Sequence, residues 1–411
     1  MIRTRGFCGA ISLCSLLMAT ACSSNEGQPA SGSAGSASAG GAGAPAGSSG
    51  AGGKGGGSGV GGSTSGGSAG SGTGSGGVTS SGGVTNTGGT AGSAGSSTGG
   101  ASGGSGGGGS GVQVFSQCRF HFGAFDEHAR NDPALAAQID YFIPGWMGTN
   151  GDVFDQGYVC AETDPGGELE GKVPVVVSYV AAAYAKRHHV PPLHDCNVGT
   201  PHLCDNGAAF IEDNLNAILD VYENFAQGYA NCYGTTRPIV FLMEPDFYQY
   251  TYESQSEPWT PQRAGEIMSL FVGTLREHLP NAAFSLDISP WVAPNNGDDD
   301  GANWYSHFDM SLFSFVNTSG GGTDAASDKI RDANNMTWAG VAAVTGKPVL
   351  ADTGYGVNGS SAGHDQAWDN VGNINARIAD GVLGIAQYNP NGNWAATIAG
   401  IRAQLDTPDC Q

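Results

Sequence analysis

Positive charge is scarce in this chain of 411 residues. It contains 16 Lys and Arg residues against 37 Asp and Glu residues, and its formal net charge at pH 7 is −21. A surface of this kind repels polyanions, so we expect neither nucleic acid nor an anionic membrane surface as a partner. Neutral polymers are not repelled by it.

Long hydrophobic runs are also missing, apart from one short stretch at the N-terminus. Residues 1–22, MIRTRGFCGAISLCSLLMATAC, carry two arginines, then an apolar run, then small residues before Cys22. This order is typical of a secretory signal, and it resembles a bacterial lipoprotein signal. We expect lipidation at Cys22 and an exported lipoprotein on the cell surface, at the outer membrane or on its periplasmic side, whose only membrane contact is the lipid anchor. The alternative is an ordinary cleaved signal peptide and a secreted protein.

Residues 23–112 lack hydrophobic periodicity. They are almost entirely Gly, Ser, Ala and Thr, and they hold most of the excess among the 70 glycines of the chain. A segment of this composition cannot bury a core and should be disordered. We therefore predict a signal at 1–22, a tether or spacer at 23–112 and one globular domain at 113–411, a size common for single α/β barrels. We expect a monomer.

Cysteine is limited to nine residues, and three of these lie in the predicted signal. An even number of cysteines in an exported domain is typical of disulfide crosslinks, so we predict three disulfides and leave their pairing open. The six domain cysteines are Cys118, Cys160, Cys196, Cys204, Cys232 and Cys410.

Short β-rich runs alternate with helical segments through the predicted domain. The runs are continuously apolar, as expected for parallel strands that are covered on both faces. Eight such units predict a (β/α)8 barrel, irregular at the fifth unit, where the helix signal is weak. The predicted strands are 119–125, 139–146, 173–180, 237–243, 282–288, 310–316, 347–352 and 381–388. The predicted helices include 210–229, 263–279, 330–346 and 365–381.

Carboxylates and aromatic side chains follow the predicted strands. In this fold the C-terminal ends of the strands form the active site, so these side chains should meet at the mouth of the barrel. The carboxylates are Glu244, Asp246, Asp287 and Asp352. The side chains that we expect to bind substrate are Trp146, Tyr179, Tyr248, Trp291, Asn317, Tyr355, Tyr388 and Trp394. No Gly-rich phosphate loop or hydroxyl nucleophile motif lies among them, so we expect no cofactor.

A mouth lined by carboxylates, Trp and Tyr suits glycoside hydrolysis. One protonated acid must give its proton to the leaving oxygen, and a second, ionised carboxylate must attack the sugar or activate water. Glu244 on the fourth strand and Asp352 on the seventh could face each other across the mouth. Glu244 follows an apolar strand, so burial could raise its pKa toward use as an acid. The sequence therefore predicts a hydrolase of a β-linked polysaccharide.

Three motifs resemble segments of glycoside hydrolase family 6, the inverting cellulases. They are MEPD at 243–246, SLDISPW at 285–291 and VLADTGYGVNG at 349–359, and FVNTSGG at 315–321 fits the same series of landmarks. The resemblance implies cleavage of a β-1,4-glucan such as cellulose. It also implies that Asp352 is the catalytic base or an electrostatic partner, with Glu244, Asp246 and Asp287 supporting it.

The chain departs from family 6 at the proton donor. That family has an Asp in a DRDC-like segment after the third strand, where this chain has SYVAAAYAKRHH, and the pair Asp195-Cys196 comes later. Either a longer loop delivers Asp195 to the mouth, or the acid has moved. The alternative resemblance is to the large clan of retaining (β/α)8 glycosidases, which act on other β-glycans such as mannan or xylan. Its layout would make Glu244 the acid, but that clan uses Glu as the nucleophile, where this chain has Asp352.

Other interpretations of the same residues remain open. Glu244 could pair with a buried Arg, and Asp246 could cap a short helix. Asp287 could be a hydrogen-bond hub, and the tryptophans could be core residues. A carbohydrate-binding protein that has lost its acid is the main rival to an enzyme. The cluster of His188, His189, His194 and His202 beside two cysteines could hold a metal. Because its spacing matches no metal motif, we expect no metal and expect Cys196 and Cys204 to be oxidised.

Overall fold

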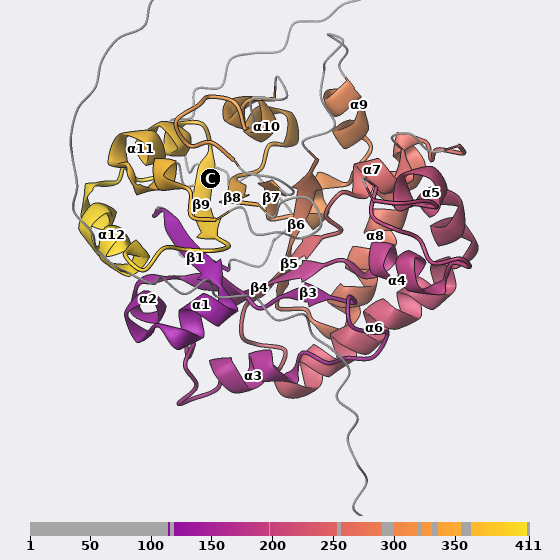
Figure 1. Ribbon diagram of the computed structural model, residues 1–411, viewed down its shortest axis with the longest axis horizontal. Coiled ribbons are helices and arrows are strands. Elements are labelled where there is room, and N and C mark those ends of the chain that lie inside the picture. The colour runs from indigo at the N-terminus through magenta and orange to yellow at the C-terminus, as the bar shows by residue number, and fades with distance from the viewer. Residues whose placement is uncertain are drawn as a thin grey trace, which may run out of the picture. The chain divides into compact units, whose positions relative to one another are not determined.

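A computed structural model describes residues 114–115, 119–196, 198–252, 256–289, 300–318, 323–330, 336–354 and 363–408. Nine parallel strands form one sheet that closes on itself (Figure 1). β2 and β3 lie in succession beside β4, so the closed sheet is an eight-stranded (β/α)8 barrel, as the sequence predicts. The strands are β1 (His121–Phe125), β2 (Tyr141–Ile143), β3 (Trp146–Met147), β4 (Val173–Ser178), β5 (Ile239–Met243), β6 (Ala282–Ile288), β7 (Phe315–Thr318), β8 (Val349–Asp352) and β9 (Val382–Gln387).

Helices surround the closed sheet (Figure 1). The N-terminal ends of α2, α8 and α10 are capped by Asp132, Thr260 and Thr337, whose side chains accept hydrogen bonds from free backbone N–H groups. The first helices are α1 (Asp126–Asn131), α2 (Pro133–Gln138), α3 (Gly157–Thr163), α4 (Val180–His188), α5 (Leu203–Asp213) and α6 (Leu215–Cys232). The others are α7 (Phe247–Thr251), α8 (Pro261–His278), α9 (Asp300–Ser306), α10 (Trp338–Thr345), α11 (Val371–Ala379) and α12 (Trp394–Ile401), with short 3-10 helices η1 (Met310–Leu312), η3 (Gln366–Asp369) and η4 (Arg402–Gln404).

The predicted strands are confirmed to within a few residues, except at 310–316, and several predicted helices are shorter or divided: 330–346 holds α10 from Trp338, and 365–381 holds η3 and α11. The region 310–316 begins with the 3-10 helix η1, and its strand starts only at Phe315. The predicted helix 210–229 is two helices that meet at Asn214, where the backbone leaves the helical conformation. The fifth unit is irregular as predicted, because α9 is short and follows residues outside the described part of the chain.

Side chains of the strands alternate between the inside and the outside of the barrel. The inside is filled by a small apolar cluster that includes Val175 and Val177 of β4 and Val240 and Leu242 of β5. Phe115, which precedes β1, belongs to the same cluster, and its ring lies 4.7 Å from His121, 5.4 Å from Tyr141 and 5.5 Å from Phe315. Because His121 is the first residue of β1, Phe115 closes the N-terminal end of the barrel, opposite the mouth.

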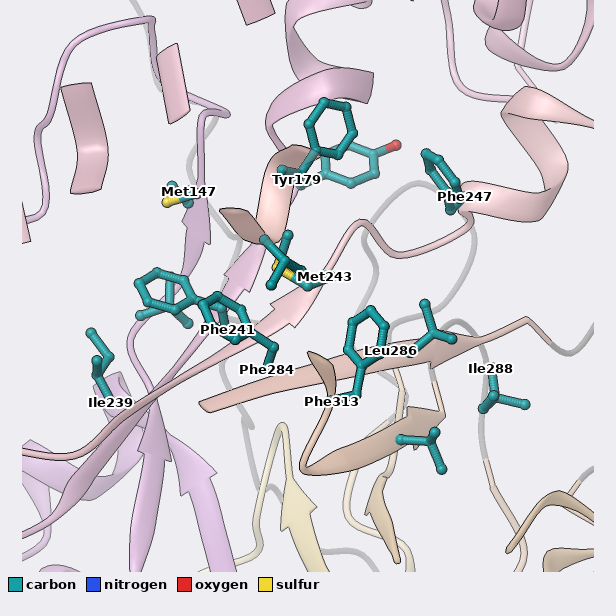
Figure 2. Packing of buried hydrophobic residues seen from close by; sticks show 14 of the residues in the cluster. Met147, Tyr179, Ile239, Phe241, Met243, Phe247, Phe284, Leu286, Ile288 and Phe313 are labelled. Carbon is teal, nitrogen blue, oxygen red and sulfur yellow. The ribbon is translucent and has the colours of Figure 1, made fainter. Parts of the chain in front are cut away.

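The larger core lies between the barrel and its helices. Figure 2 shows Phe241 and Met243 of β5 beside Phe284, Leu286 and Ile288 of β6, all of which face outward. The rings of Phe241 and Phe284 stack with centroids 6.0 Å apart. This apolar layer holds each helix against the barrel and thereby fixes the strand ends that carry the candidate site.

Two disulfides join described cysteines. Cys160 of α3 pairs with Cys232 at the end of α6, and Cys196 pairs with Cys204. The predicted third pair would have to use Cys118 and Cys410, which both lie outside the described residues. Within the described ranges, no helix combines the length and the apolar character that crossing a membrane requires.

A buried pair of carboxyl groups lies between α1 and α3. Asp126 and Glu162 are 5% and 6% exposed, and their only close cation among the described residues is Arg130, whose Nη1 lies 3.4 Å from Glu162 Oε1. Burial is the main cause that raises the pKa of Asp126 to about 6. Burial and the charge of Asp126 raise the pKa of Glu162 to about 7. Asp126 therefore opens α1 and does not face the mouth.

This pair predicts a stability that falls with rising pH. Both folded-state pKa values lie above the unfolded ones, so the stabilisation is complete below about pH 4 and is lost as the pH rises through 6 to 7. Allowing for solvent screening, we expect the free energy of unfolding to drop by about 1–2 kcal/mol between pH 5 and pH 7.5. The Glu162→Gln variant should lose most of this drop in urea unfolding curves, and the exposed Glu223→Gln variant should keep it. A Glu162→Gln variant whose free energy of unfolding falls with pH as steeply as that of the native chain would contradict the assignment.

Candidate active site at the barrel mouth

Asp287 is the centre of a hydrogen-bond network on the inner wall. Because Leu286 and Ile288 face the helices, the alternation along β6 points Asp287 into the barrel, where it is 5% exposed. Its Oδ1 accepts a hydrogen bond from Asn317 Nδ2 at 3.2 Å, and its Oδ2 accepts one from the backbone N–H of Asp246 at 3.2 Å. The hub interpretation of Asp287 is therefore confirmed, and Asn317 is a part of this network.

Asp246 lies on the rim beside this hub. It precedes α7 in the left-handed conformation, with φ of 63°, and its side chain makes no capping hydrogen bond to that helix. A left-handed Asp is tolerated because its short polar side chain can bond locally, and here the backbone N–H is held by Asp287. The helix-cap interpretation of Asp246 is wrong, since its side chain does not cap α7.

Asp352 ends β8 and shares the inner wall with Asp287. It is 4% exposed, and one of its carboxylate oxygens, Oδ1, accepts a hydrogen bond from Gly354 N at 2.7 Å. Tyr388, which follows β9, lies within electrostatic range of both carboxylates: burial first, and then the charges of Asp352 and Asp287, raise its pKa well above the ordinary value. Both predicted carboxylates therefore act electrostatically on the same tyrosine.

Asp195 follows α4 and lies beside Lys186 and Tyr179. Its neighbours His194 and Cys196 are held by backbone bonds from His194 N to Pro201 O and from Leu203 N to His194 O, both 2.9 Å, and by the Cys196–Cys204 disulfide. The Asp195 side chain is 44% exposed and forms an ion pair with Lys186 Nζ at 2.7 Å. The role of Asp195 as the proton donor stays a prediction.

Tyr179 connects Asp195 with the rest of the rim. It follows β4, and burial, Asp195, Asp246 and Glu244, in that order, raise the pKa of its hydroxyl well above the ordinary value. Its ring meets Trp146 of β3 edge-on at 5.1 Å and Tyr250 of α7 at 6.5 Å. Lys186 Nζ lies 6.0 Å from the centre of the same ring. Tyr179 is 7% exposed and belongs to the outer core, against which Trp146 packs, so their binding of substrate stays a prediction.

Glu244 does not face the mouth, which corrects the prediction that it is a catalytic acid. Strand alternation would place it inside the barrel after Val240 and Leu242, but its φ of 43° turns the side chain outward. It is fully buried, its Oε1 accepts from Ala181 N at 2.8 Å and from the Tyr222 hydroxyl, and its Oε2 accepts from the Tyr250 hydroxyl at 2.6 Å. Burial raises the pKa of Glu244 above its ordinary value, and these hydrogen-bond donors offset only a part of the rise.

The carboxyl group of Glu244 caps α4. Ala181 is in the first turn of that helix, where backbone N–H groups have no partner within the helix. Two tyrosines from other helices, Tyr222 of α6 and Tyr250 of α7, complete the arrangement. The ion-pair interpretation is also wrong, because the partners are backbone and hydroxyl donors. Glu244 thus joins the end of β5 to three helices.

Two other predicted aromatic contacts differ from expectation. Trp394 begins α12 and is fully buried in the outer core, edge-on to Phe122 at 5.7 Å and near His364 at 5.3 Å, so its predicted stacking on sugar is wrong. Tyr248 is 9% exposed in α7 and meets the Trp304 ring edge-on at 5.0 Å. Trp291, Tyr355 and Cys22 lie outside the described residues.

The histidine cluster has local partners of other kinds. His188 Nε2 lies 2.7 Å from Asp152 Oδ2, and His202 Nε2 lies 3.1 Å from Asp205 Oδ2. Among the described residues, no three His, Cys, Asp or Glu side chains are grouped closely enough to hold a metal ion. The Cys196–Cys204 disulfide removes both thiols of the segment as ligands.

Sequence reasoning missed three aromatic side chains at the site. Trp304 and Tyr305 of α9 pack beside Tyr248, and the Tyr305 hydroxyl accepts a hydrogen bond from Ser289 N at 3.0 Å. Tyr141 of β2 points into the barrel below the mouth. The alternation Tyr141, Phe142, Ile143 could have placed Tyr141 inside, but only the strand register shows which residues share its level.

Comparison with known proteins gives a likeness of fold. No family model matches the chain, and no curated protein matches it in sequence. A Cellulomonas fimi endo-β-1,4-mannanase double mutant is 15% identical over 68% of this chain and 70% of that chain, with a TM-score of 0.44. The protein GH26C from Muricauda sp. MAR_2010_75 is 14% identical over 70% and 86%, with a TM-score of 0.45.

Barrels with other chemistry match to a similar degree. The carboxyl transferase domain of Rhizobium etli pyruvate carboxylase is 11% identical over 72% of this chain and 47% of that chain, with a TM-score of 0.41. At these identities the likeness concerns the fold alone and assigns no activity. The predicted resemblance to glycoside hydrolase family 6 finds no support in these comparisons. The structure therefore defines the chain as a (β/α)8 barrel with an acidic, aromatic mouth.

Proposed function

We propose that the chain is a glycoside hydrolase that cleaves a β-linked polysaccharide, with Asp352 and Asp195 as the two working carboxylates. The observation that carries the proposal is the convergence of Asp246, Asp287 and Asp352 at the C-terminal ends of three barrel strands, with Asp195 beside Tyr179 after a fourth strand. Hydrolysis of a glycosidic bond requires two carboxyl groups on opposite sides of the sugar. The other carboxylates of the mouth then hold the site in place.

The roles follow from what each carboxylate already binds. Asp287 uses both oxygens within the protein, on Asn317 and on the backbone of Asp246, so it positions its neighbours. Glu244 is committed to the N-terminus of α4. Asp352 and Asp195 lie on different sides of the mouth, one beside Tyr388 and the other beside Tyr179. Variants separate their roles, since loss of the base removes the acidic limb of the pH profile and loss of the acid removes the alkaline limb.

The walls between the two carboxylates suit a sugar chain. Trp146 of β3 is half-buried and meets the Tyr179 ring edge-on. Tyr388 stacks on Phe125 at 5.7 Å on the other wall. Aromatic faces pack against the apolar faces of pyranose rings, and a strongly acidic surface does not repel a neutral polymer. We propose β-1,4-glucan as the first substrate to test, with mannan and xylan as alternatives.

Release of reducing ends from soluble β-1,4-glucan, β-1,4-mannan and β-1,4-xylan tests this function. We expect the native chain to release reducing ends from at least one of them and the Asp352→Asn variant to release none above background. Binding to a glycan without release would instead support the rival, a carbohydrate-binding surface protein that has lost catalysis. An export signal with a lipid on Cys22 is proposed for the same molecule, and mass spectrometry of the membrane-bound N-terminus would test it.

A further inference from the structure

Tyr141 lies on the same inner wall as Asp352, and only two small residues separate them. In the strand register Asp352 of β8 pairs with Ala386 of β9, Ala386 pairs with Gly123 of β1, and Gly123 pairs with Tyr141 of β2. These four residues form one row across four adjacent strands. Three strand spacings amount to about 14 Å along the wall, and the straight line through the curved barrel is shorter.

The small residues of this row leave the space that the tyrosine ring fills. A side chain at Gly123 would collide with the ring of Tyr141, which lies over the glycine. Ala386 adds only a methyl group to the inner cluster. From below, Phe115 packs on the Tyr141 ring with centroids 5.4 Å apart. The ring is therefore fixed between the plug at the closed end of the barrel and the small residues beneath Asp352.

The Tyr141 hydroxyl is a buried hydrogen-bond donor that has no acceptor among the described residues. Tyr141 is 1% exposed, and its hydroxyl has no hydrogen-bond partner among the described residues. Buried hydroxyl groups in folded proteins are nearly always hydrogen-bonded to protein or water. Burial, followed by the charges of Asp352 and then Asp140, raises the pKa of Tyr141 well above its ordinary value, so the group keeps its proton.

We propose that Tyr141 is a positioning residue for Asp352, to whose carboxylate its hydroxyl donates through a bound water. The inference rests on the proposed function only for its effect on catalysis; the contact itself does not depend on it. A donor beneath the carboxylate would orient it and stabilise its ionised form. Other titratable groups share this interior. Tyr388, which follows β9, and Asp287 of β6 lie above Tyr141, and His121 of β1 and Asp140 lie below it.

The Tyr141→Phe variant tests the proposal because it removes the hydroxyl and keeps the ring. On the glycan that the native chain cleaves, we expect kcat/KM to fall about ten-fold at neutral pH and the acidic limb of the pH profile to move to higher pH. KM should change little, since the residue does not touch substrate. The matched control is Tyr229→Phe on α6, which loses a buried hydroxyl that donates to Gln156 at 2.6 Å. This variant should leave the acidic limb of the pH profile in place.

A second readout needs no activity. Selective carboxyl labelling of aspartate and NMR titration should show Asp352 titrating at higher pH in Tyr141→Phe than in the native chain, and at the native pH in Tyr229→Phe. If the native chain cleaves no glycan, the function fails, while this titration still decides the contact. If Tyr141→Phe titrates and reacts like the native chain, the inference is overturned and the proposed function stands.

Discussion

The Asp352→Asn variant is expected to cleave its glycan about 1,000-fold more slowly than the native chain, because a neutral amide can neither accept a proton nor attack a sugar. Asparagine keeps the size of the side chain and can still accept the hydrogen bond from Gly354 N through its carbonyl oxygen. We therefore expect the free energy of unfolding to stay within about 1 kcal/mol of the native value. Initial rates of reducing-end release and urea unfolding curves provide the two measurements.

Asp309→Asn is the matched control for this loss. Asp309 is an exposed carboxylate that caps the short helix η1 before β7, on the side of the barrel away from the mouth, and asparagine caps a helix as well as aspartate. Its rate should equal that of the native chain. A tenfold or smaller loss in Asp352→Asn would mean that another group performs the step, and an equal loss in both variants would point to a general effect on the protein.

Glu244→Ala is expected to lower the free energy of unfolding by about 3–5 kcal/mol. The substitution leaves Ala181 N and the hydroxyls of Tyr222 and Tyr250 buried without an acceptor, and it opens a void where three helices meet β5. Glu244→Gln keeps one acceptor oxygen and the volume, so it should cost about 1–2 kcal/mol. Chemical denaturation at fixed pH measures both values.

The matched control for the loss in stability is Glu277→Ala, an exposed glutamate on α8, which should change the unfolding free energy by no more than about 0.5 kcal/mol. Glu244→Gln should also keep a glycosidase rate within a few-fold of the native one, because the group caps α4 and does not face the sugar. A stable Glu244→Gln protein that had lost its activity would restore Glu244 as the acid.

The barrel could be predicted because each strand is a short, continuously apolar run that can be recognised from the local sequence. Runs such as VPVVVSYV at 173–180 are apolar on both faces, and each is followed by a segment of helical character. Asp287 and Asp352 could be placed at the mouth for the same reason, since each ends a strand and the alternation points it inward. Strand pattern therefore carries most of the fold and part of the site.

The residues that sequence reasoning misplaced depend on conformation or on distant contacts. Glu244 fits the inward pattern of β5, but a left-handed backbone at that residue and at Asp246, which no residue type in the motif requires, reverses its direction. Trp394 follows a strand but begins a helix, so its ring enters the outer core. Tyr141 and Asp352 share one row of the sheet, which only the register of four strands reveals. Such pairings are set by the closure of the whole barrel.

Glycosidase rates of Asp352→Asn and Glu244→Gln, measured side by side at a temperature where both are folded, test the central claim most directly. The account predicts a loss of about 1,000-fold in Asp352→Asn and nearly native activity in Glu244→Gln, since Asp352 lies on the inner wall at the mouth and Glu244 caps α4. The opposite pattern, an active Asp352→Asn and an inactive Glu244→Gln, would contradict it.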